Sequence, residues 1–354
     1  MTATPFPDPC SVDSLTETQV ASALGNLLDE SLPSAPKADF LGALHRRGET
    51  AEELASFSRH LLDRAIRPAM GRHRDALLLE LCGTGGDRAG YLNISTAAMF
   101  VAAGAGARVL KHGNRAFSSQ SGSADVLEAL GVNLHLDPER VGEVMEKAGC
   151  VFLLASDFHP AFAVLGPLRR EMAAQGEMTI FNLLGPLLNP GIPEVQLTGI
   201  YRSPMLPVYA KAMKLLGRRR AWAVHGESAN SGGVDEVSIL GSTAVYEISQ
   251  DHADRRVAIT PVEFGLPRAA DDSSLLGGDA SENAAKIIAI LEGRELSPAA
   301  DMIVINAAAA LHLAGIGTSL KESASLASES IRSGKALSAL HRLREASVLA
   351  MKGA

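Results

Sequence analysis

The sequence predicts an α/β fold, in which a small N-terminal helical domain precedes a large α/β domain with a central, mostly parallel sheet flanked by helices. Two observations lead to this prediction. Over about the first seventy residues, apolar side chains recur at helical spacing and no strand pattern appears. Beyond them, short continuous apolar runs, typical of strands buried on both faces, alternate with helical stretches. Because 46% of the residues are hydrophobic and only 4% aromatic, the core must consist mainly of Ala, Leu, Val and Ile.

The N-terminal region is expected to contain a loose tail and three helices. Three prolines among the first nine residues resist regular structure, so residues 1–13 are assigned to the tail. A helical pattern begins at Ser14, and a second one ends at Gly48. A third follows Thr50, which has the capping-box spacing to Glu53. We expect the helical domain to comprise residues 14–75 and about 166–192, and the α/β domain to comprise residues 76–165 and 193–354.

The stretch from Leu77 to Asp87 predicts the first strand of the sheet and the turn after it. An apolar run breaks into Gly83-Thr84-Gly85-Gly86-Asp87, where three glycines in four positions permit backbone angles that other residues avoid. A helical pattern follows from Ile94 to Ala103. This succession directs several backbone N–H groups to one point, which favours an anion site, usually for phosphate. The spacing fits neither the NTPase loop nor the dinucleotide fingerprint, and a tight turn without a ligand is the alternative.

A basic segment follows the next predicted strand. Residues 107–110 have the pattern of a short strand, and Lys111-His-Gly-Asn-Arg115 comes at its end. Ligands of open α/β sheets bind beyond the carboxyl ends of the strands, so this segment and the glycine turn should face the same crevice. A lone basic pentapeptide is usually a solvated turn. One βα unit after a glycine turn, it is interpreted as a phosphate clamp, to which Ser118, Ser119, Ser121 and Ser123 add hydroxyl donors.

The βα alternation continues to the end of the chain. We expect strands over residues 150–155, 195–201, 221–225 and 244–248, and helices over 124–130, 138–149 and 204–216 and from residues 284, 301, 320 and 334 onward. Asp157 and His159 stand at the end of the strand that starts at residue 150, again on the crevice side. The run from Asn306 to Ala310 is interpreted as tight helix packing, without a catalytic role.

Four motifs occur together in this chain: Gly83–Asp87, Asn93-Ile-Ser-Thr96, Lys111–Arg115 and Asp235-Glu236. In this order they resemble the motif set of the anthranilate phosphoribosyltransferases, a family of tryptophan biosynthesis. The resemblance runs from about Leu15 to the C-terminal helices. It implies the transfer of phosphoribose from 5-phosphoribosyl 1-diphosphate to the amino group of anthranilate, with release of diphosphate and with Mg²⁺ as cofactor. The family shares its fold with the pyrimidine nucleoside phosphorylases, so the fold alone does not decide the reaction.

The resemblance also implies a set of site residues. The phosphoribosyl diphosphate would be held by Gly83, Thr84, Gly85, Gly86, Asp87, Asn93, Ser95, Thr96, Lys111 and Ser123. Anthranilate would contact Gly83, His112, Asn114, His159 and Arg169, with Arg170 as the alternative arginine. A guanidinium suits this role because it binds a planar carboxylate through paired hydrogen bonds. Mg²⁺ would be bound by Ser95, Asp235 and Glu236; adjacent carboxylates are usually only solvated, but opposite a diphosphate they suit this oxygen-preferring ion.

Two stretches depart from the family pattern. The segment between Arg170 and Thr179 is about three residues longer than usual, and Met178 stands where a basic residue is common. The loop over residues 226–234 is about four residues longer. Both changes lie at edges of the expected crevice. A phosphoribosyltransferase or nucleoside phosphorylase with another acceptor therefore stays open as an alternative. A non-catalytic relative that binds nucleic acid is a second alternative, which predicts a basic stripe and degraded motifs, whereas this chain is acidic and its motifs are intact.

Composition limits the partners and the compartment. The net charge of −7 argues against nucleic-acid binding, and no run approaches the roughly 20 apolar residues that span a bilayer. The N-terminus lacks the basic and apolar parts of a signal peptide. Cys10, Cys82 and Cys150 are widely separated and form neither a disulfide framework nor a metal-binding spacing. We therefore expect a cytoplasmic protein without nucleic-acid or membrane partners, and the resemblance implies a homodimer formed through the helical domain.

Overall fold

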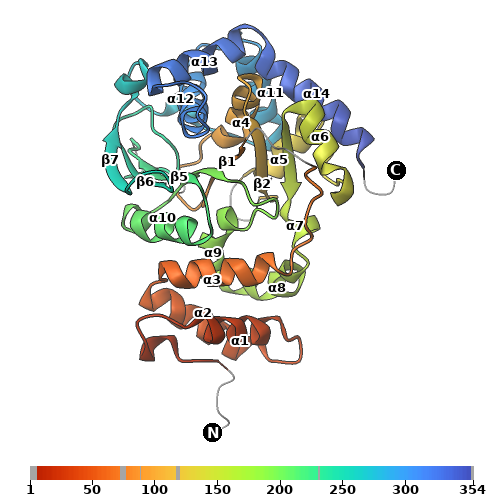
Figure 1. The fold of residues 1–354 in the computed structure, drawn as a ribbon, viewed down its shortest axis with the longest axis vertical. Helices are drawn as coiled ribbons and strands as arrows, with labels where there is room; N and C mark the ends of the chain where they lie inside the picture. The colour runs from red at the N-terminus through yellow and green to blue at the C-terminus, as the bar shows by residue number, and fades with distance from the viewer. Residues whose placement is uncertain (1–5, 72–76, 88, 117–119, 230–231, 352–354) are drawn as a thin grey trace.

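The computed structural model describes residues 6–71, 77–87, 89–116, 120–229 and 232–351. It confirms the predicted fold class, because the N-terminal helices lie below one seven-stranded sheet that carries helices on both faces (Figure 1). The strand order is β3-β2-β1-β4-β5-β6-β7. The first five strands in this order are parallel, and β6 and β7 add antiparallel pairs at one edge. Among the described residues, no helix has both the length and the apolar character needed to span a bilayer.

The third strand in this order has a parallel neighbour on each side, so its carboxyl end lies between theirs. The strands are β1 (Leu78–Gly83), β2 (Arg108–Gly113), β3 (Cys150–Leu154), β4 (Val195–Gly199), β5 (Arg220–Gly226), β6 (Thr243–Ser249) and β7 (Arg255–Ile259). Strand β1 pairs with β2 on one side and with β4 on the other. The sequence did not predict β7, because four of its five residues are exposed at the sheet edge and carry no apolar alternation.

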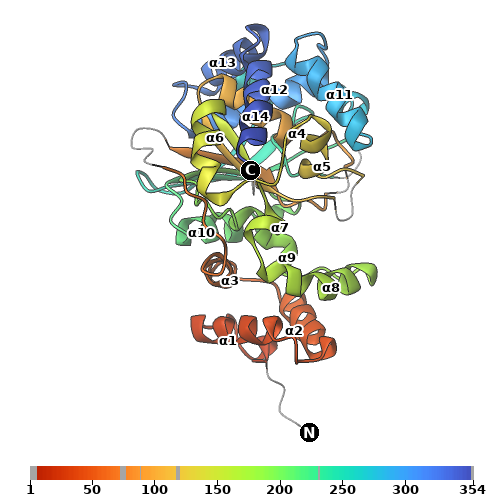
Figure 2. The same ribbon diagram turned by 90° about the vertical axis from the view of Figure 1, so that its right-hand side faces the viewer.

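One face of the sheet is covered by the larger layer of helices (Figures 1 and 2). This layer consists of α4 (Ile94–Gly104), α5 (Ser123–Ala129), α6 (Val141–Ala148), α11 (Ala280–Leu291), α12 (Pro298–Leu313), α13 (Leu320–Arg332) and α14 (Lys335–Leu349). Helices α4 and α12 lie against each other in its centre and are buried almost all round. Their many alanines permit this close approach, and together with the sheet they form the larger hydrophobic core.

The opposite face of the sheet is covered by α10 and by segments of the helical domain. These elements are α1 (Glu17–Leu28), α2 (Ser34–Arg47), α3 (Ala51–Leu62), α7 (Ala155–Phe158), α8 (Ala161–Ala174), α9 (Phe181–Leu184) and α10 (Leu206–Leu215). Helix α3 packs against α10, and α1 packs against α3 and α8. The second hydrophobic core therefore runs from Leu24 of α1 through Tyr209 of α10 to Ala223 of β5. The expected capping box of Thr50 and Glu53 forms at the start of α3.

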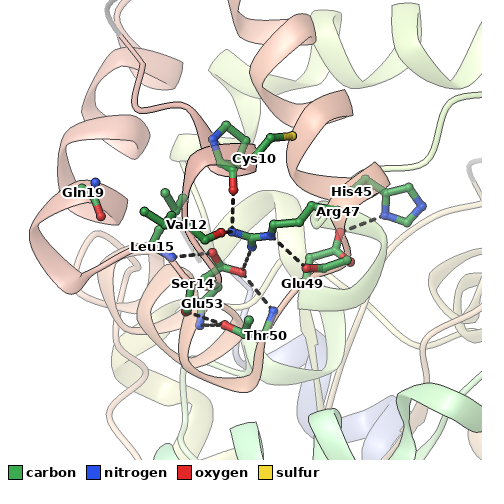
Figure 3. Close-up of polar contacts among 12 residues, drawn as sticks. Cys10, Val12, Ser14, Leu15, Gln19, His45, Arg47, Glu49, Thr50 and Glu53 are labelled. Atoms are coloured by element: carbon green, nitrogen blue, oxygen red, sulfur yellow. Dashed lines mark hydrogen bonds and ion pairs between the residues drawn. The ribbon is translucent and has the colours of Figure 1, made fainter.

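The second part of the expected N-terminal tail, from Phe6 onward, packs against the helical domain (Figure 3). Phe6 is buried and stacks on Phe40, with the ring centroids 4.9 Å apart. The Arg47 guanidinium donates a hydrogen bond of 3.0 Å to the backbone carbonyl of Pro9 and pairs with the carboxylate of Glu53. The prolines do not prevent this arrangement, because a proline is tolerated at the start of a helical turn. The first five residues lie outside the part of the chain that the structure describes.

Candidate active site

The site lies where β1, β2 and β4 end. The sequence placed Lys111 and His112 after the second strand, and this boundary is wrong: β2 continues to Gly113 because its ladder with β3 extends to the pair Gly113–Leu154. Successive residues of a strand project to opposite faces of the sheet. Lys111 therefore lies on the α4 side, where it contacts Ser95, and His112 lies on the side of the helical domain. These two neighbours divide the site into two halves.

The glycine turn after β1 has the backbone geometry that its sequence predicts. Gly85 and Gly86 adopt φ angles of +69° and +89°, in the left-handed region that favours glycine. The Thr84 N–H donates to the Gly199 carbonyl at 2.9 Å, which ties the turn to β4. The Thr84 hydroxyl accepts a hydrogen bond of 3.1 Å from the Tyr201 N–H. The turn is thus fixed to β4 while its glycine backbone stays exposed.

The acidic pair Asp235-Glu236 lies beside this turn, with Asp235 buried and Glu236 partly buried, and is not a fully solvated loop. Asp235 is 9% exposed, and its Oδ2 accepts a hydrogen bond of 2.6 Å from the Gly85 N–H. The Asp235 N–H donates to Asp87 Oδ2 at 3.4 Å, so the glycine turn and the acidic pair contact each other twice. Glu236 lies at the start of α4, where a hydrogen bond from the Ser95 backbone favours its charged form.

Two glycines make room for Asp235 at the end of the sheet. Gly83 of β1 and Gly199 of β4 are paired in register. A Cβ on Gly83 would lie 2.3 Å from Asp235 Oδ2, and a Cβ on Gly199 would lie 1.5 Å from the Asp235 carbonyl oxygen. Gly83 therefore shapes the site by the space it leaves free, a role that the motif alone does not reveal.

The charges in this half of the site are unbalanced. Burial, with repulsion from Asp87, raises the pKa of Asp235 well above its usual range. Burial also raises the pKa of Glu236 to about 8, although nearby Lys111 opposes the rise. Lys111 Nζ is itself buried, donates to the Leu81 carbonyl at 2.8 Å and to Ser95 Oγ at 3.0 Å, and has its pKa lowered by burial. Crowded carboxylates of this kind are stabilised by a cation.

The donor set fits Mg²⁺ on these grounds, since it combines carboxylate oxygens with the Ser95 hydroxyl. Within the described ranges, no group of three or more His, Cys, Asp or Glu side chains is arranged to hold a metal ion by itself. An ion bound here would need oxygens from a substrate and from water as well. This requirement agrees with a metal that binds together with a diphosphate.

The start of α4 is tied to two other segments by Asn283. Asn93 Oδ1 accepts hydrogen bonds from Asn283 Nδ2 at 3.0 Å and from Ser121 Oγ at 3.3 Å. Asn283 Nδ2 also donates to Ser121 Oγ at 2.8 Å. Its Oδ1 accepts from the Gly278 N–H at 2.8 Å. Asn283 was not predicted as a site residue, although Gly277 and Gly278 mark a turn before the helix that contains it. Thr96, in the first turn of α4, is buried at 1% exposure.

The rest of the predicted basic clamp is dispersed. Arg115 forms ion pairs with Glu128 at 2.7 Å and with Asp125 at 3.3 Å, so this arginine is engaged by α5. Asn114 is exposed, and its carbonyl accepts a hydrogen bond of 3.4 Å from Ser123 Oγ. The predicted hydroxyl donors at positions 118 and 119 lie outside the described residues.

The second half of the site contains two neutral histidines. The rings of His112 and His159 meet edge to face, with their centroids 5.2 Å apart. Burial lowers the pKa of His112 to about 3, with a further contribution from His159, and burial lowers the pKa of His159 to about 4. His159 Nε2 lies 2.7 Å from the Leu188 carbonyl, which fixes the ring and identifies Nε2 as the protonated nitrogen. Both imidazoles are uncharged at neutral pH.

Arg169 extends this half of the site across two aromatic rings. Its Cζ lies 5.3 Å from the centroid of Phe162 and 5.7 Å from that of Phe181, and Phe162 in turn packs edge-on against His159. The neighbouring Arg170 is exposed. The structure therefore brings Arg169, and not Arg170, to the histidines. Phe162 and Phe181 were not predicted, although Phe162 lies three residues after His159 in the same helical region.

The two longer segments lie outside the residues that form the two halves of the site. Arg169 lies in α8, which ends at Ala174 with Gly176 at a φ of +75°, so the extra residues follow the arginine. The longer loop is closed at its base by two hydrogen bonds between Gly226 and Val234, of 3.0 and 2.8 Å. The acidic pair follows directly after this bridge.

A buried polar cluster binds the backbone of His112. Glu80, on β1, is fully buried, and its Oε1 accepts a hydrogen bond of 3.2 Å from the His112 N–H. Burial raises the pKa of Glu80 to about 7, against the opposing effect of Arg218. Arg218 Nε donates to Gln196 Oε1 at 2.7 Å, and Gln196 Nε2 donates to the Pro186 carbonyl at 2.7 Å. The cluster thus connects β1, β2 and β4 to the segment that returns from the helical domain.

Comparison with known proteins gives one consistent result. The chain matches two sequence families: "Glycosyl transferase family, helical bundle domain" over residues 11–65, and "Glycosyl transferase family, a/b domain" over residues 75–337. It is 45% identical over 329 residues to an anthranilate phosphoribosyltransferase of Roseiflexus castenholzii, which covers 93% of each chain.

Solved structures agree with the sequence matches. The anthranilate phosphoribosyltransferase of Thermus thermophilus superimposes with a TM-score of 0.86 at 39% identity, covering 97% of this chain and all of that one. The enzyme of Saccharomyces cerevisiae, solved in complex with PRPP and Mg, superimposes with a TM-score of 0.83 at 28% identity, covering 94% of this chain and 92% of that one.

Proposed function

The chain belongs to the anthranilate phosphoribosyltransferase family of the glycosyl transferases, and on this basis we propose how its residues carry out the family's reaction. The protein transfers the phosphoribosyl group of 5-phosphoribosyl 1-diphosphate to the amino group of anthranilate and releases diphosphate, a step of tryptophan biosynthesis. The observation that best supports separate binding sites for the two substrates is the orientation of Lys111 and His112. From one strand, Lys111 points to an acidic half-site and His112 points to an aromatic half-site.

The acidic half-site would hold the phosphoribosyl diphosphate. The exposed backbone of Gly85 and Gly86 offers N–H donors to phosphate oxygens, and Lys111 supplies positive charge. The remaining residues proposed for this substrate are Gly83, Thr84, Asp87, Asn93, Ser95, Thr96 and Ser123. Carboxylates outnumber the lysine here, so the site by itself repels a polyanion. Binding of the diphosphate therefore depends on a cation.

Mg²⁺ would be held by Ser95, Asp235 and Glu236, as the donor chemistry described above supports. When bound, the ion neutralises diphosphate and so improves it as a leaving group. The residues of the chain position the sugar: the turn after β1 grips the diphosphate, and the anomeric carbon is left facing the His112 side. The C1–O bond to diphosphate breaks with oxocarbenium character while the new C1–N bond forms, and the amino nitrogen loses a proton to solvent. Positioning therefore contributes more than covalent catalysis.

The aromatic half-site would hold anthranilate. The side chains of His112 and His159 are neutral and flat, and Arg169 offers a guanidinium to the carboxylate of the substrate. Gly83 and Asn114 complete the contacts we propose. Because neither histidine is charged at neutral pH, the arginine alone among these residues provides positive charge for the acid group.

Three further features belong to this proposal. We assign residues 14–75 and about 166–192 to the helical domain, and residues 76–165 and 193–354 to the α/β domain. A homodimer through the helical domain follows from the family resemblance, and light scattering of the purified protein tests it. The cytoplasm is the proposed compartment, in keeping with three free cysteines and a biosynthetic reaction.

The deciding experiment is an assay of phosphoribosyl transfer with anthranilate, other aromatic amines and nucleobases as acceptors. We expect turnover with anthranilate that requires Mg²⁺ and is lost in Arg169→Ala at low acceptor concentration. Turnover with a nucleobase and none with anthranilate would instead identify a phosphoribosyltransferase with a different acceptor, and phosphorolysis of a nucleoside would identify a nucleoside phosphorylase. Binding of nucleic acid without any transfer would leave only the fold of the family.

A further inference from the structure

Helix α12 contains one buried asparagine in an apolar stretch. Asn306 is 1% exposed and is followed by four buried alanines. A side-chain amide in such surroundings costs stability unless its donors and its acceptor are satisfied. The sequence suggested only tight packing for this segment, so the hydrogen bonds of Asn306 carry new information.

Asn306 pairs with both backbone groups of a single residue, Val237. Its Oδ1 accepts a hydrogen bond from the Val237 N–H at 2.9 Å, and its Nδ2 donates to the Val237 carbonyl at 2.9 Å. Nδ2 also donates to the Met302 carbonyl at 2.9 Å, one helical turn earlier. The side-chain amide thus makes the two hydrogen bonds that a paired strand residue would make with Val237, and it ties Val237 to α12.

Val237 directly follows Asp235 and Glu236. We propose that Asn306 is a positioning residue that, by holding the Val237 backbone, sets where these two carboxylates stand for Mg²⁺ and diphosphate. This inference rests on the metal role given to the acidic pair in the proposed function. Asn306 itself touches neither the ion nor a substrate and acts only through Val237.

The acidic segment is also fitted closely from the sheet side. A Cβ on Gly226 would lie 2.6 Å from the Glu236 carbonyl oxygen, and the Asp235 carbonyl occupies the space beside Gly199. The glycines limit how far the segment can move toward the sheet, and Asn306 holds it toward α12. A change that frees Val237 from Asn306 therefore removes the tie to α12 and lets the two carboxylates move relative to the glycine turn.

Two substitutions at Asn306 separate positioning from packing. Asn306→Leu keeps the branched shape and the number of heavy atoms, although its methyl groups are larger, and leaves both backbone groups of Val237 without the amide partner. Asn306→Asp keeps an acceptor for the Val237 N–H but sets an oxygen against the Val237 carbonyl. The matched control is Asn189→Leu, because Asn189 is equally buried but bonds the Leu110 carbonyl and the Gly191 N–H on the other face of the sheet.

The measurement is a calorimetric titration of each full-length protein with magnesium diphosphate, beside circular dichroism and thermal unfolding. We expect both Asn306 variants to fold and to bind magnesium diphosphate at least tenfold more weakly than the wild type, and Asn189→Leu to bind it like the wild type. In activity assays, the Mg²⁺ concentration for half-maximal rate should rise for the Asn306 variants, while the KM for anthranilate stays unchanged.

The outcomes distinguish this inference from the proposed function. Folded Asn306 variants with wild-type affinity for magnesium diphosphate would overturn the positioning role alone. Loss of folding in both variants would overturn it too, because Asn306 would then be needed for the helix and not for the metal site. If the wild type itself does not bind magnesium diphosphate, the metal assignment in the proposed function is wrong.

Discussion

The Asp235 carbonyl oxygen lies against Gly199 so closely that a Cβ at this glycine would be 1.5 Å away from it. No side chain can share that space, so any residue other than glycine must displace the acidic segment or open the sheet. The relationship makes Gly199 a sensitive position although it carries no functional group.

We therefore expect Gly199→Ala to lower kcat/KM by at least about 100-fold and to destabilise the protein by about 1–3 kcal/mol through overpacking. The control is Gly25→Ala, in the middle of α1, where a Cβ meets no atom within 4 Å. That change should stabilise the protein by about 0.5–1 kcal/mol and leave activity alone. Urea unfolding and steady-state kinetics measure both effects, and a fully active Gly199→Ala would contradict the close contact.

Lys111→Met should raise the KM for phosphoribosyl diphosphate by at least about tenfold, because a buried charge opposite the diphosphate is lost. The KM for anthranilate should change little, since Lys111 lies on the face of the sheet away from His112. Lys214→Met is the control: this lysine pairs with Asp254 at the surface. An unchanged diphosphate KM in Lys111→Met would remove the lysine from the phosphate site.

The double variant Asp235→Asn, Glu236→Gln should lose turnover by orders of magnitude but gain stability in the absence of metal. The folded-state pKa of Glu236 is about 8, above its usual value of 4.5, so folding favours the protonated form and its penalty grows as the pH rises from 4.5 to 8. The gain in unfolding free energy should thus be larger at pH 8 than at pH 5. Asp235 is buried and Glu236 is partly buried, so the charges of both are removed from much of the solvent. Equal gains at both pH values would speak against the crowded carboxylates.

Arg169→Ala should raise the KM for anthranilate by about 10- to 100-fold, equivalent to about 1.5–3 kcal/mol for a lost charged hydrogen bond. Arg170→Ala serves as its control, because Arg170 is exposed and should leave this KM unchanged. The KM for phosphoribosyl diphosphate should stay constant in both. If only Arg170→Ala raises the anthranilate KM, the arginine has been assigned to the wrong position.

Glu80→Gln should stabilise the protein more at high pH than at low pH. Burial raises the folded-state pKa of Glu80 to about 7, so its charge opposes folding increasingly between pH 4.5 and 7. The glutamine keeps an acceptor for the His112 N–H, and the gain in unfolding free energy should be about 2 kcal/mol larger at pH 8 than at pH 5. Urea unfolding at the two pH values tests this, and the same gain at both would mean that folding does not raise the pKa of Glu80.

The sequence predicted the elements that depend on local patterns. The glycine turn was predictable because Gly85 and Gly86 are needed where φ is positive, and α4 was predictable from its apolar run. The extent of β2 was not, since only its pairing with β3 carries the strand past Leu110. Asn306 escaped prediction for a related reason: its partner Val237 is 69 residues away, and no local pattern records such a contact.

The core shared by the helical domain and the sheet has a consequence for synthesis on the ribosome. Helix α3 is completed at Leu62, but α10, against which it packs, begins only at Leu206, 144 positions later. At about 5–20 residues per second, roughly 7–30 seconds separate the two. During that interval the apolar side of α3 lacks its final partner, so the nascent chain presents leucine and phenylalanine side chains that a chaperone would recognise. The first part of the protein to be made is therefore among the last to be finished.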